Sequence, residues 1–156
     1  KGYRSGYVTV ELFDWHIDAR VQGALREGRK IDFAKLKSLF VKVVEESILF
    51  NDDVAKIVFG YSPVHVVLLH ENDLNALFIT DLVKMLNRLD FRVVKAQEAF
   101  SDPIADPRWD NFPGSMRRTR LIAKQNSYGG NLSSKWTSEK TLDRLIAEFG
   151  VIKGNG

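Results

Sequence analysis

Residues 66–76 read Val-Val-Leu-Leu-His-Glu-Asn-Asp-Leu-Asn-Ala, an apolar run that ends on a titratable residue and continues as polar chain. Such a run is typical of a strand buried on both faces of a parallel sheet. Ligands of α/β proteins bind outside the carboxyl ends of these strands, so His70 is predicted to lie at a site. The alternative is a histidine that makes only structural hydrogen bonds.

Residues 7–15, Tyr-Val-Thr-Val-Glu-Leu-Phe-Asp-Trp, form a second β-rich run, which ends in carboxylates and an aromatic ring. If the two strands are parallel neighbours, both deliver side chains to the same rim of the sheet. Asp14 is then expected to orient the imidazole of His70 and to favour its protonated form as a general acid, and Trp15 to wall a sugar-sized pocket. Alternatively, Asp14 caps the next turn and Trp15 belongs to the core.

Helical and β patterns alternate along the first hundred residues. Asp32 is a candidate N-cap for a helix to about residue 50, which residues 51–53 (Asn-Asp-Asp) stop or interrupt. Asp73 is a candidate cap of a second helix, and residues 91–94 form a third β-rich run. Strands that alternate with helices predict right-handed βαβ units around a parallel sheet, which is an α/β fold.

The sequence changes character after Ser101, where Asp-Pro pairs indicate a connecting segment. Residues 117–120 then read Arg-Arg-Thr-Arg. A basic cluster of this kind can meet phosphate or an anionic glycan, but a solvated helix face is the favoured prediction. Thr137 or Ser138 is expected to cap a final amphipathic helix that ends at Gly150.

Composition limits the kinds of partner. The 156 residues carry 23 lysines and arginines against 20 aspartates and glutamates, a formal net charge of +3. This excess is too small to indicate a nucleic-acid or membrane-surface partner. The chain has no cysteine, which excludes disulfides and thiolate zinc sites. Hydrophobic residues make up 44%, enough for a globular core, and no apolar run approaches the about 20 residues of a membrane span.

Together, the two strand-end motifs resemble the polysaccharide deacetylase family (NodB-homology domains, carbohydrate esterase family four). Residues 7–15 are similar to its fourth motif, in which an acidic residue, two spacers and Asp-Trp follow a Val-Thr-Val strand. Residues 67–70, Val-Leu-Leu-His, are similar to its fifth motif, Leu-x-Leu-His. Asp18-Ala19-Arg20 and Asn72-x-x-Asn75-Ala76 match one subgroup of the family.

This resemblance implies a fold and a division of the chain. Residues 1–102 are expected to be the carboxyl-terminal half of a NodB-like domain, which supplies the last strands of a distorted (β/α) barrel. That barrel has about seven strands, against eight in the TIM barrel. Residues 103–156 are expected to form a mostly helical and loop extension packed on the same domain.

The resemblance also implies an activity, the hydrolysis of N-acetyl (or O-acetyl) groups on a carbohydrate polymer. His70 would protonate the leaving amine, Asp14 would tune it, and Trp15 and Leu68 would line the acetyl-binding groove. Glu11 stands where the family usually has Asp, so its role is open. The expected substrate-binding residues are Trp15, Leu68, Glu11, Asn72 and Asn75.

Several family features have no counterpart in this sequence: the first motif (Thr-Phe-Asp-Asp), the His-x-x-x-His metal pair and the Arg-x-Pro segment. The only histidines are His16, His65 and His70, and they form no metal-binding pair. The divalent metal, by resemblance zinc, is therefore expected on residues outside this chain. The expected partners are an acetylated glycan and a missing N-terminal segment, or another chain, that completes the barrel. An extracytoplasmic location, periplasmic or secreted, also follows by resemblance.

One alternative belongs to another class. The chain can be a non-catalytic glycan-binding or scaffolding relic that kept the deacetylase fold with its acidic and aromatic rim.

Overall fold

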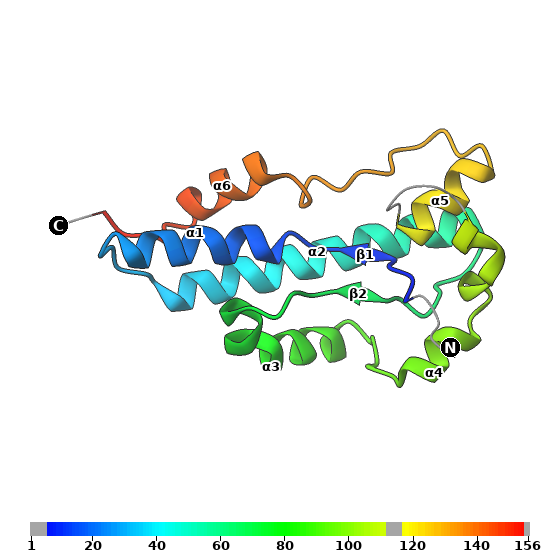
Figure 1. Ribbon diagram of the computed structural model, residues 1–156, viewed down its shortest axis with the longest axis horizontal. Helices are drawn as coiled ribbons and strands as arrows, with labels where there is room; N and C mark the ends of the chain where they lie inside the picture. The colour runs from blue at the N-terminus through cyan, green and yellow to red at the C-terminus, as the bar shows by residue number, and fades with distance from the viewer. Residues whose placement is uncertain (1–5, 112–116, 155–156) are drawn as a thin grey trace.

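The computed structural model describes residues 6–111 and 117–154 of the chain. It is an elongated, mostly helical molecule with one small parallel sheet (Figure 1). The elements in chain order are β1 (Val10–Glu11), α1 (Asp14–Arg26), α2 (Phe33–Phe59), β2 (Val67–Leu68), α3 (Asp73–Arg88), α4 (Ala96–Ser101), the 3₁₀ turns η1 (Pro103–Ala105) and η2 (Pro107–Asn111), α5 (Arg118–Gln125) and α6 (Glu139–Glu148).

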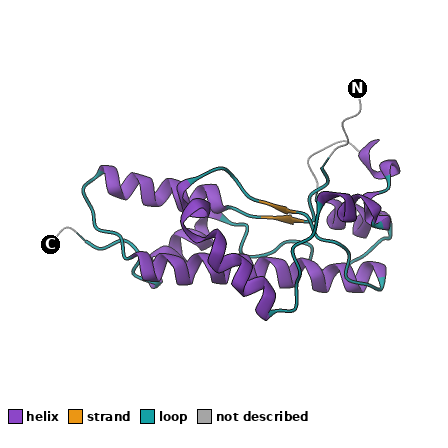
Figure 2. Ribbon diagram, turned by 90° about the horizontal axis from the view of Figure 1, so that it is seen from below, coloured by secondary structure: helices purple, strands orange, loops and turns teal. Residues whose placement is uncertain are grey.

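The sheet consists of β1 and β2, which run parallel with Val10 opposite Val67 and Glu11 opposite Leu68. Figure 2 shows both strands near the middle of the molecule with helices around them. The predicted parallel neighbours are therefore confirmed, but the α/β character is weak and no barrel is evident in the described ranges. The third strand predicted at residues 91–94 is wrong, because this segment pairs with no strand in the described part of the chain and Val93 is 63% exposed.

Helix α1 is an element that the sequence interpretation missed, since it expected only a turn after Asp14. Its buried positions, Asp14, Ile17, Val21 and Ala24, recur at helical spacing. The helix begins two residues after the end of β1, and Asp14 is its first residue. Only Leu12 and Phe13 separate the strand end from the helix start.

Helix α2 runs without a break to Phe59, so the interruption predicted at residues 51–53 is wrong. Asp32 caps it as predicted, accepting a hydrogen bond from the Lys35 backbone N–H at 3.2 Å. The polar residues inside it are accommodated because they find partners, such as the Ser47 carbonyl for the Asn51 amide at 2.7 Å. The helix ends at Gly60, whose φ of 79° suits a residue without Cβ.

Helix α3 packs against α1 and α2. Asn72, rather than the predicted Asp73, is its N-cap and accepts from the Asn75 N–H at 2.9 Å. Leu77 of this helix is 56% exposed. The main core lies between these helices and α6, and its fully buried large side chains include Leu12, Ile17, Leu36, Leu39, Phe40, Ile48, Leu74, Met85 and Leu142.

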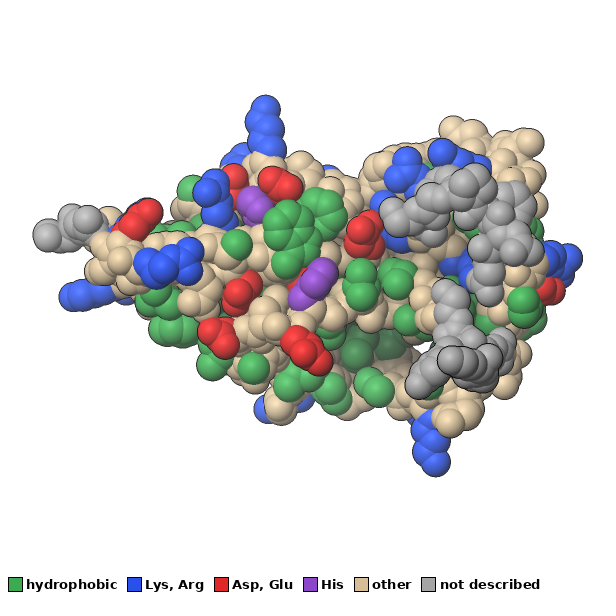
Figure 3. All heavy atoms as spheres, in the orientation of Figure 1, with side chains coloured by type: hydrophobic (Ala, Val, Ile, Leu, Met, Phe, Trp, Pro, Cys, Tyr) green, Lys and Arg blue, Asp and Glu red, His purple; other side chains and the backbone are tan. Residues whose placement is uncertain are grey.

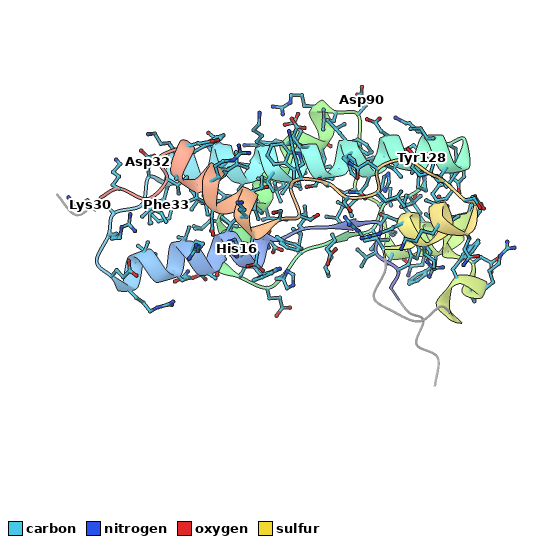
Figure 4. The ribbon with its side chains drawn as sticks, turned by 90° about the horizontal axis from the view of Figure 1, so that it is seen from above. His16, Lys30, Asp32, Phe33, Asp90 and Tyr128 are labelled. Carbon is cyan, nitrogen blue, oxygen red and sulfur yellow. The ribbon has the colours of Figure 1, made fainter. Side chains whose placement is uncertain are left out.

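The last helix, α6, is capped by Ser138 as predicted and is followed by Gly150 with a φ of 61°. It is fastened to α1 by Asp143, which accepts from His16 at 2.8 Å and from Arg20 through two contacts of 2.6 Å. Figure 4 shows His16 between these two helices. The hydrogen bonds from Arg20 lower the pKa of Asp143 to about 2.

The C-terminal segment returns to the loop between α1 and α2. Ile152 forms a bridge with Ile31, and the Asp32 N–H donates to the Val151 carbonyl at 2.8 Å. Lys30, Asp32 and Phe33 lie at this end of the molecule in Figure 4. Residues beyond 102 therefore contact the first part of the chain at several points, while the domain boundary at 102 stays a prediction.

A buried Asp52–His65 pair connects α2 to the segment before β2. His65 Nε2 lies 3.1 Å from Asp52 Oδ1, and both side chains are about 5% exposed or less. Burial lowers the pKa of His65. Burial also opposes ionisation of Asp52, but hydrogen bonds from Lys56, Ser62 and His65 outweigh it, so the pKa of Asp52 is lowered.

Acidification should weaken the fold through this pair. Because both pKa values are lower in the folded protein, the unfolded chain binds more protons and stability rises with pH. The contribution of His65 is present above its ordinary pKa of 6.5 and is lost as the pH drops below that value, while the contribution of Asp52 is lost only below its ordinary pKa of 3.8. His65→Asn, which takes up no proton, should remove the first part of this loss, at most about 1.4 kcal/mol per pH unit.

Urea unfolding of wild type and His65→Asn at about pH 7.5 and about pH 5.5 measures this difference. Asp53 is an exposed neighbour of Asp52, so Asp53→Asn is the control. This variant should keep the wild-type pH dependence of the free energy of unfolding. Equal pH dependence of His65→Asn and wild type would contradict the expectation.

Candidate functional site

The ends of β1 and β2 bring Asp14 and His70 together. Asp14 Oδ1 lies 2.8 Å from His70 Nδ1, and Asp14 Oδ2 accepts from the His70 backbone N–H at 2.9 Å. The prediction that these two side chains lie within hydrogen-bond distance is therefore confirmed. Their roles in chemistry remain predictions.

The carboxylate of Asp14 is completely buried and is the acceptor at the centre of the site. Besides the two contacts with His70, its Oδ2 accepts from the side-chain amides of Asn72 at 3.1 Å and Asn75 at 2.6 Å. Asn75 also donates to the His70 carbonyl at 2.9 Å. Asp14 thus has a partner for each of its oxygens, which holds the loop after β2 in place.

This arrangement fixes the orientation of the His70 imidazole. An ionised carboxylate only accepts hydrogen bonds, so the nitrogen beside Asp14 is the protonated one. The other nitrogen, Nε2, has no hydrogen-bond partner in the described part of the chain, and the side chain is 43% exposed. His70 therefore presents Nε2 to solvent, where it can accept or donate a proton.

Pairing with aspartate alone does not distinguish His70, because all three histidines of the chain do it. The His16 and His65 side chains are 10% and 5% exposed, and each joins two elements of the fold. His70 is the exposed one of the three. Exposure of one imidazole edge above a buried carboxylate is what marks it as a candidate for function.

The other predicted site residues divide into two groups. Trp15, Leu68 and Glu11 are about 40% exposed, so each has surface available to a ligand. Leu68 lies opposite Glu11 in the sheet register and two residues before His70, so these three side chains share one side of the strands. Figure 3 shows a histidine beside an apolar patch and acidic side chains in the middle of one face of the molecule.

Asn72 and Asn75, predicted to bind substrate, both donate to Asp14. Their contact with a ligand stays a prediction. The Oδ1 of Asn75 is buried without a hydrogen-bond partner in the described ranges, although both of its amide contacts are made. This unused acceptor lies beside the candidate site.

The sequence interpretation missed the burial of two arginines at the start of α5. Arg117 and Arg118 are 7% and 6% exposed, so the prediction of a solvated helix face at 117–120 is wrong for them. Arg118 donates from its backbone N–H to the Val8 carbonyl at 2.7 Å, which attaches the start of α5 to the chain entering β1. Arg117 Nε lies 3.7 Å from Glu11 Oε2. The spacing in the sequence alone does not reveal this contact.

The described residues contain no group of three or more metal-binding side chains, so they offer no metal site. None of the helices within 6–111 and 117–154 combines the length and apolar character needed to cross a bilayer.

A scan against protein-family models, a search of curated proteins and a search of solved structures each found no match to this chain. The family resemblance of the two motifs therefore stays a prediction.

Removing the Asp14 carboxylate should destabilise the protein much more than removing the His70 imidazole. Asp14→Ala leaves several donors without their acceptor, and we expect a loss of about 3 kcal/mol or more in the free energy of unfolding. His70→Ala removes one partly exposed contact and should cost about 1 kcal/mol or less. Asp18→Ala, on the same helix, removes the acceptor of the Leu74 N–H and is the control.

Urea unfolding of the three variants provides the comparison. We expect Asp18→Ala to stay close to His70→Ala. A loss in His70→Ala as large as in Asp14→Ala would show that His70 is a structural residue like His16 and His65.

Proposed function

We propose that this chain is part of a hydrolase, and more particularly of a metal-dependent deacetylase that removes N-acetyl (or O-acetyl) groups from a carbohydrate polymer. The observation that supports it is the exposed His70 imidazole held by the buried Asp14 carboxylate at 2.8 Å. These two residues occupy the positions that the motif resemblance assigns to the general acid and to the residue that tunes it.

The chemistry of the described residues is proton transfer. Water adds to the acetyl carbonyl and passes a proton to a base that the proposal places outside this chain. When the carbon–nitrogen bond of the tetrahedral adduct then breaks, the departing amine needs a proton. In this proposal Nε2 of protonated His70 donates it, while Asp14 keeps Nδ1 protonated and the ring in one orientation. Protonating the nitrogen converts a poor leaving group into a neutral amine.

The divalent metal that the resemblance implies, zinc, does not fit the described residues, because they contain no cluster of metal-binding side chains. The proposal assigns the metal to residues outside this chain. No step assigned here to His70 or Asp14 depends on it.

The glycan would lie across the exposed side of the two strands. Trp15 offers an apolar ring face of the kind that stacks on sugars, and its orientation is supported by Phe13 at a centroid distance of 5.5 Å. Leu68 lies nearby on the same side of the sheet as His70, and in the proposal it contacts the acetyl methyl group.

The sheet itself supports a further partner. Each strand has one strand neighbour in the described ranges, which leaves the outer edges of a two-stranded parallel sheet unpaired. Parallel sheets are normally larger and covered on both faces. We propose that a preceding segment or another chain adds strands here and completes a NodB-type barrel, in an extracytoplasmic setting.

The second candidate function is a non-catalytic glycan-binding or scaffolding protein. It is favoured by the lack of a metal-binding cluster in the described residues, and by the structural contacts that Asp14 makes whether or not His70 reacts.

Turnover by the complete protein tests the first candidate. With metal supplied and an acetylated chitooligosaccharide as substrate, His70→Ala should lower kcat by about 10²–10⁴-fold, because the leaving amine then departs without a positioned acid. Glu71→Ala, an exposed neighbour of His70, is the matched control and should keep wild-type turnover.

Binding of the same oligosaccharide, measured by calorimetry, separates the two candidates. Wild-type turnover in His70→Ala would remove this residue from the mechanism. Binding without any acetate release by the metal-supplied wild type would favour the non-catalytic protein.

A further inference from the structure

The start of α5 carries a concentration of positive charge that the proposed function does not use. Residues 117–120 place Arg117 at the N-cap position, with Arg118 and Arg120 in the first turn. The Arg117 side chain makes no capping hydrogen bond to this helix end. Helix N-termini carry partial positive charge and usually attract acidic side chains, so three arginines at this place are unusual. Figure 3 shows lysines and arginines gathered around this end of the molecule.

Three buried polar atoms of this turn have no hydrogen-bond partner within the described ranges: Arg117 Nη1, Thr119 Oγ1 and Arg120 Nε. Arg117 is 7% exposed and Thr119 is 1% exposed. Unsatisfied buried donors, and charged ones above all, are costly and rare in proteins. Arg118 differs from its neighbours, because its guanidinium donates to the carbonyls of Ile104 and Asp106.

The positive charge of Arg117 and Arg120 is only partly compensated by the carboxylate described near them. In the described ranges Glu11 Oε2 lies 3.7 Å from Arg117 Nε, which is an ion-pair contact but too long for a direct hydrogen bond. Burial lowers the pKa of Arg117, and the neighbouring Arg120 charge adds to this effect while Glu11 opposes it. The Arg117 guanidinium therefore lies near a second positive charge as well as near one carboxylate.

The cluster adjoins the candidate site through β1. Glu11 is the register partner of Leu68, and His70 follows Leu68 by two residues, a separation of about 6–7 Å along an extended chain. The Glu11 side chain is 41% exposed, so the boundary between Arg117 and the His70 side of the strands is open to solvent. A polymer that crosses the strands at His70 and continues past Leu68 and Glu11 would meet the arginines.

We propose that Arg117 and Arg120 form an anion subsite that binds a carboxylate or phosphate group carried by the glycan at the His70 site. This inference rests on the proposed glycan function and narrows the substrate class to acidic glycans. An anionic oxygen group would supply the acceptors that these buried donors lack, and guanidinium groups bind such groups through charge-assisted hydrogen bonds. The N-terminus of α5 adds to the attraction.

Binding measurements test the subsite without any turnover. The probes are inorganic phosphate, a trigalacturonate and a neutral chitotriose, titrated into the full chain at constant ionic strength and followed by calorimetry and by NMR of the arginine Nε–H signals. We expect the trigalacturonate to bind at least about tenfold more tightly than chitotriose and to shift the Arg117 and Arg120 signals.

Charge variants give the sharper result. Arg117→Gln and Arg120→Gln should each weaken trigalacturonate binding about tenfold, whereas Arg92→Gln, whose guanidinium is highly exposed, should leave it unchanged. Glu11→Gln removes the competing carboxylate and should strengthen binding. If the arginines only stabilise the fold through Glu11, Glu11→Gln should instead leave anion binding at the level of chitotriose.

The binding measurements distinguish the anion subsite from the alternatives. Equal binding of trigalacturonate and chitotriose, or unchanged binding in both arginine variants, overturns the subsite. Binding of phosphate alone overturns its assignment to a glycan. Trigalacturonate binding that depends on these arginines, in a protein that releases no acetate, supports the subsite and contradicts the hydrolase.

Discussion

The buried carboxylate of Asp14 is the interaction on which the arrangement of the sheet and site depends. It lies where β1 passes into α1, and it accepts hydrogen bonds from the backbone and side chain of His70 and from Asn72 and Asn75. The contact with the His70 N–H continues the pairing of the two strands beyond their short ladder. Asp14 therefore joins the two strand ends and also fixes the orientation of the His70 imidazole. The same carboxylate serves the fold and the candidate site.

The opposite end of the strand pair is held by another side chain. Thr9 Oγ1 accepts from the Val66 N–H at 2.8 Å and lies 3.1 Å from His65 Nδ1, whose other nitrogen meets Asp52 on α2. The ladder of β1 and β2 covers only two residues per strand, which would be weak alone. Side-chain contacts at both ends therefore replace the backbone pairing that further strands would provide.

Local sequence could predict the meeting of Asp14 and His70, because both follow apolar runs and parallel strands end at one rim. Other features depend on contacts between distant residues. Helix α2 continues through residues 51–53 because Ser62 and His65 form hydrogen bonds with Asp52. The local sequence Asn-Asp-Asp by itself indicates only the end of a helix. The burial of Arg117 depends on α5 docking onto the chain before β1, and no periodicity within residues 117–120 indicates it.

A series of contacts connects the His70 imidazole to the arginines at the start of α5. The backbone of Arg118 is bound to Val8, Arg117 faces Glu11 on β1, and Glu11 is paired with Leu68 on β2, which leads directly to His70. The Arg118–Val8 and Glu11–Leu68 links are backbone contacts, and the Arg117–Glu11 link is a side-chain contact at a partly exposed carboxylate. The strands therefore set most of the spacing between the proton donor and the positive cluster. A rigid separation of this kind suits a repeating polymer, in which a charged group recurs at a fixed distance from the group that reacts.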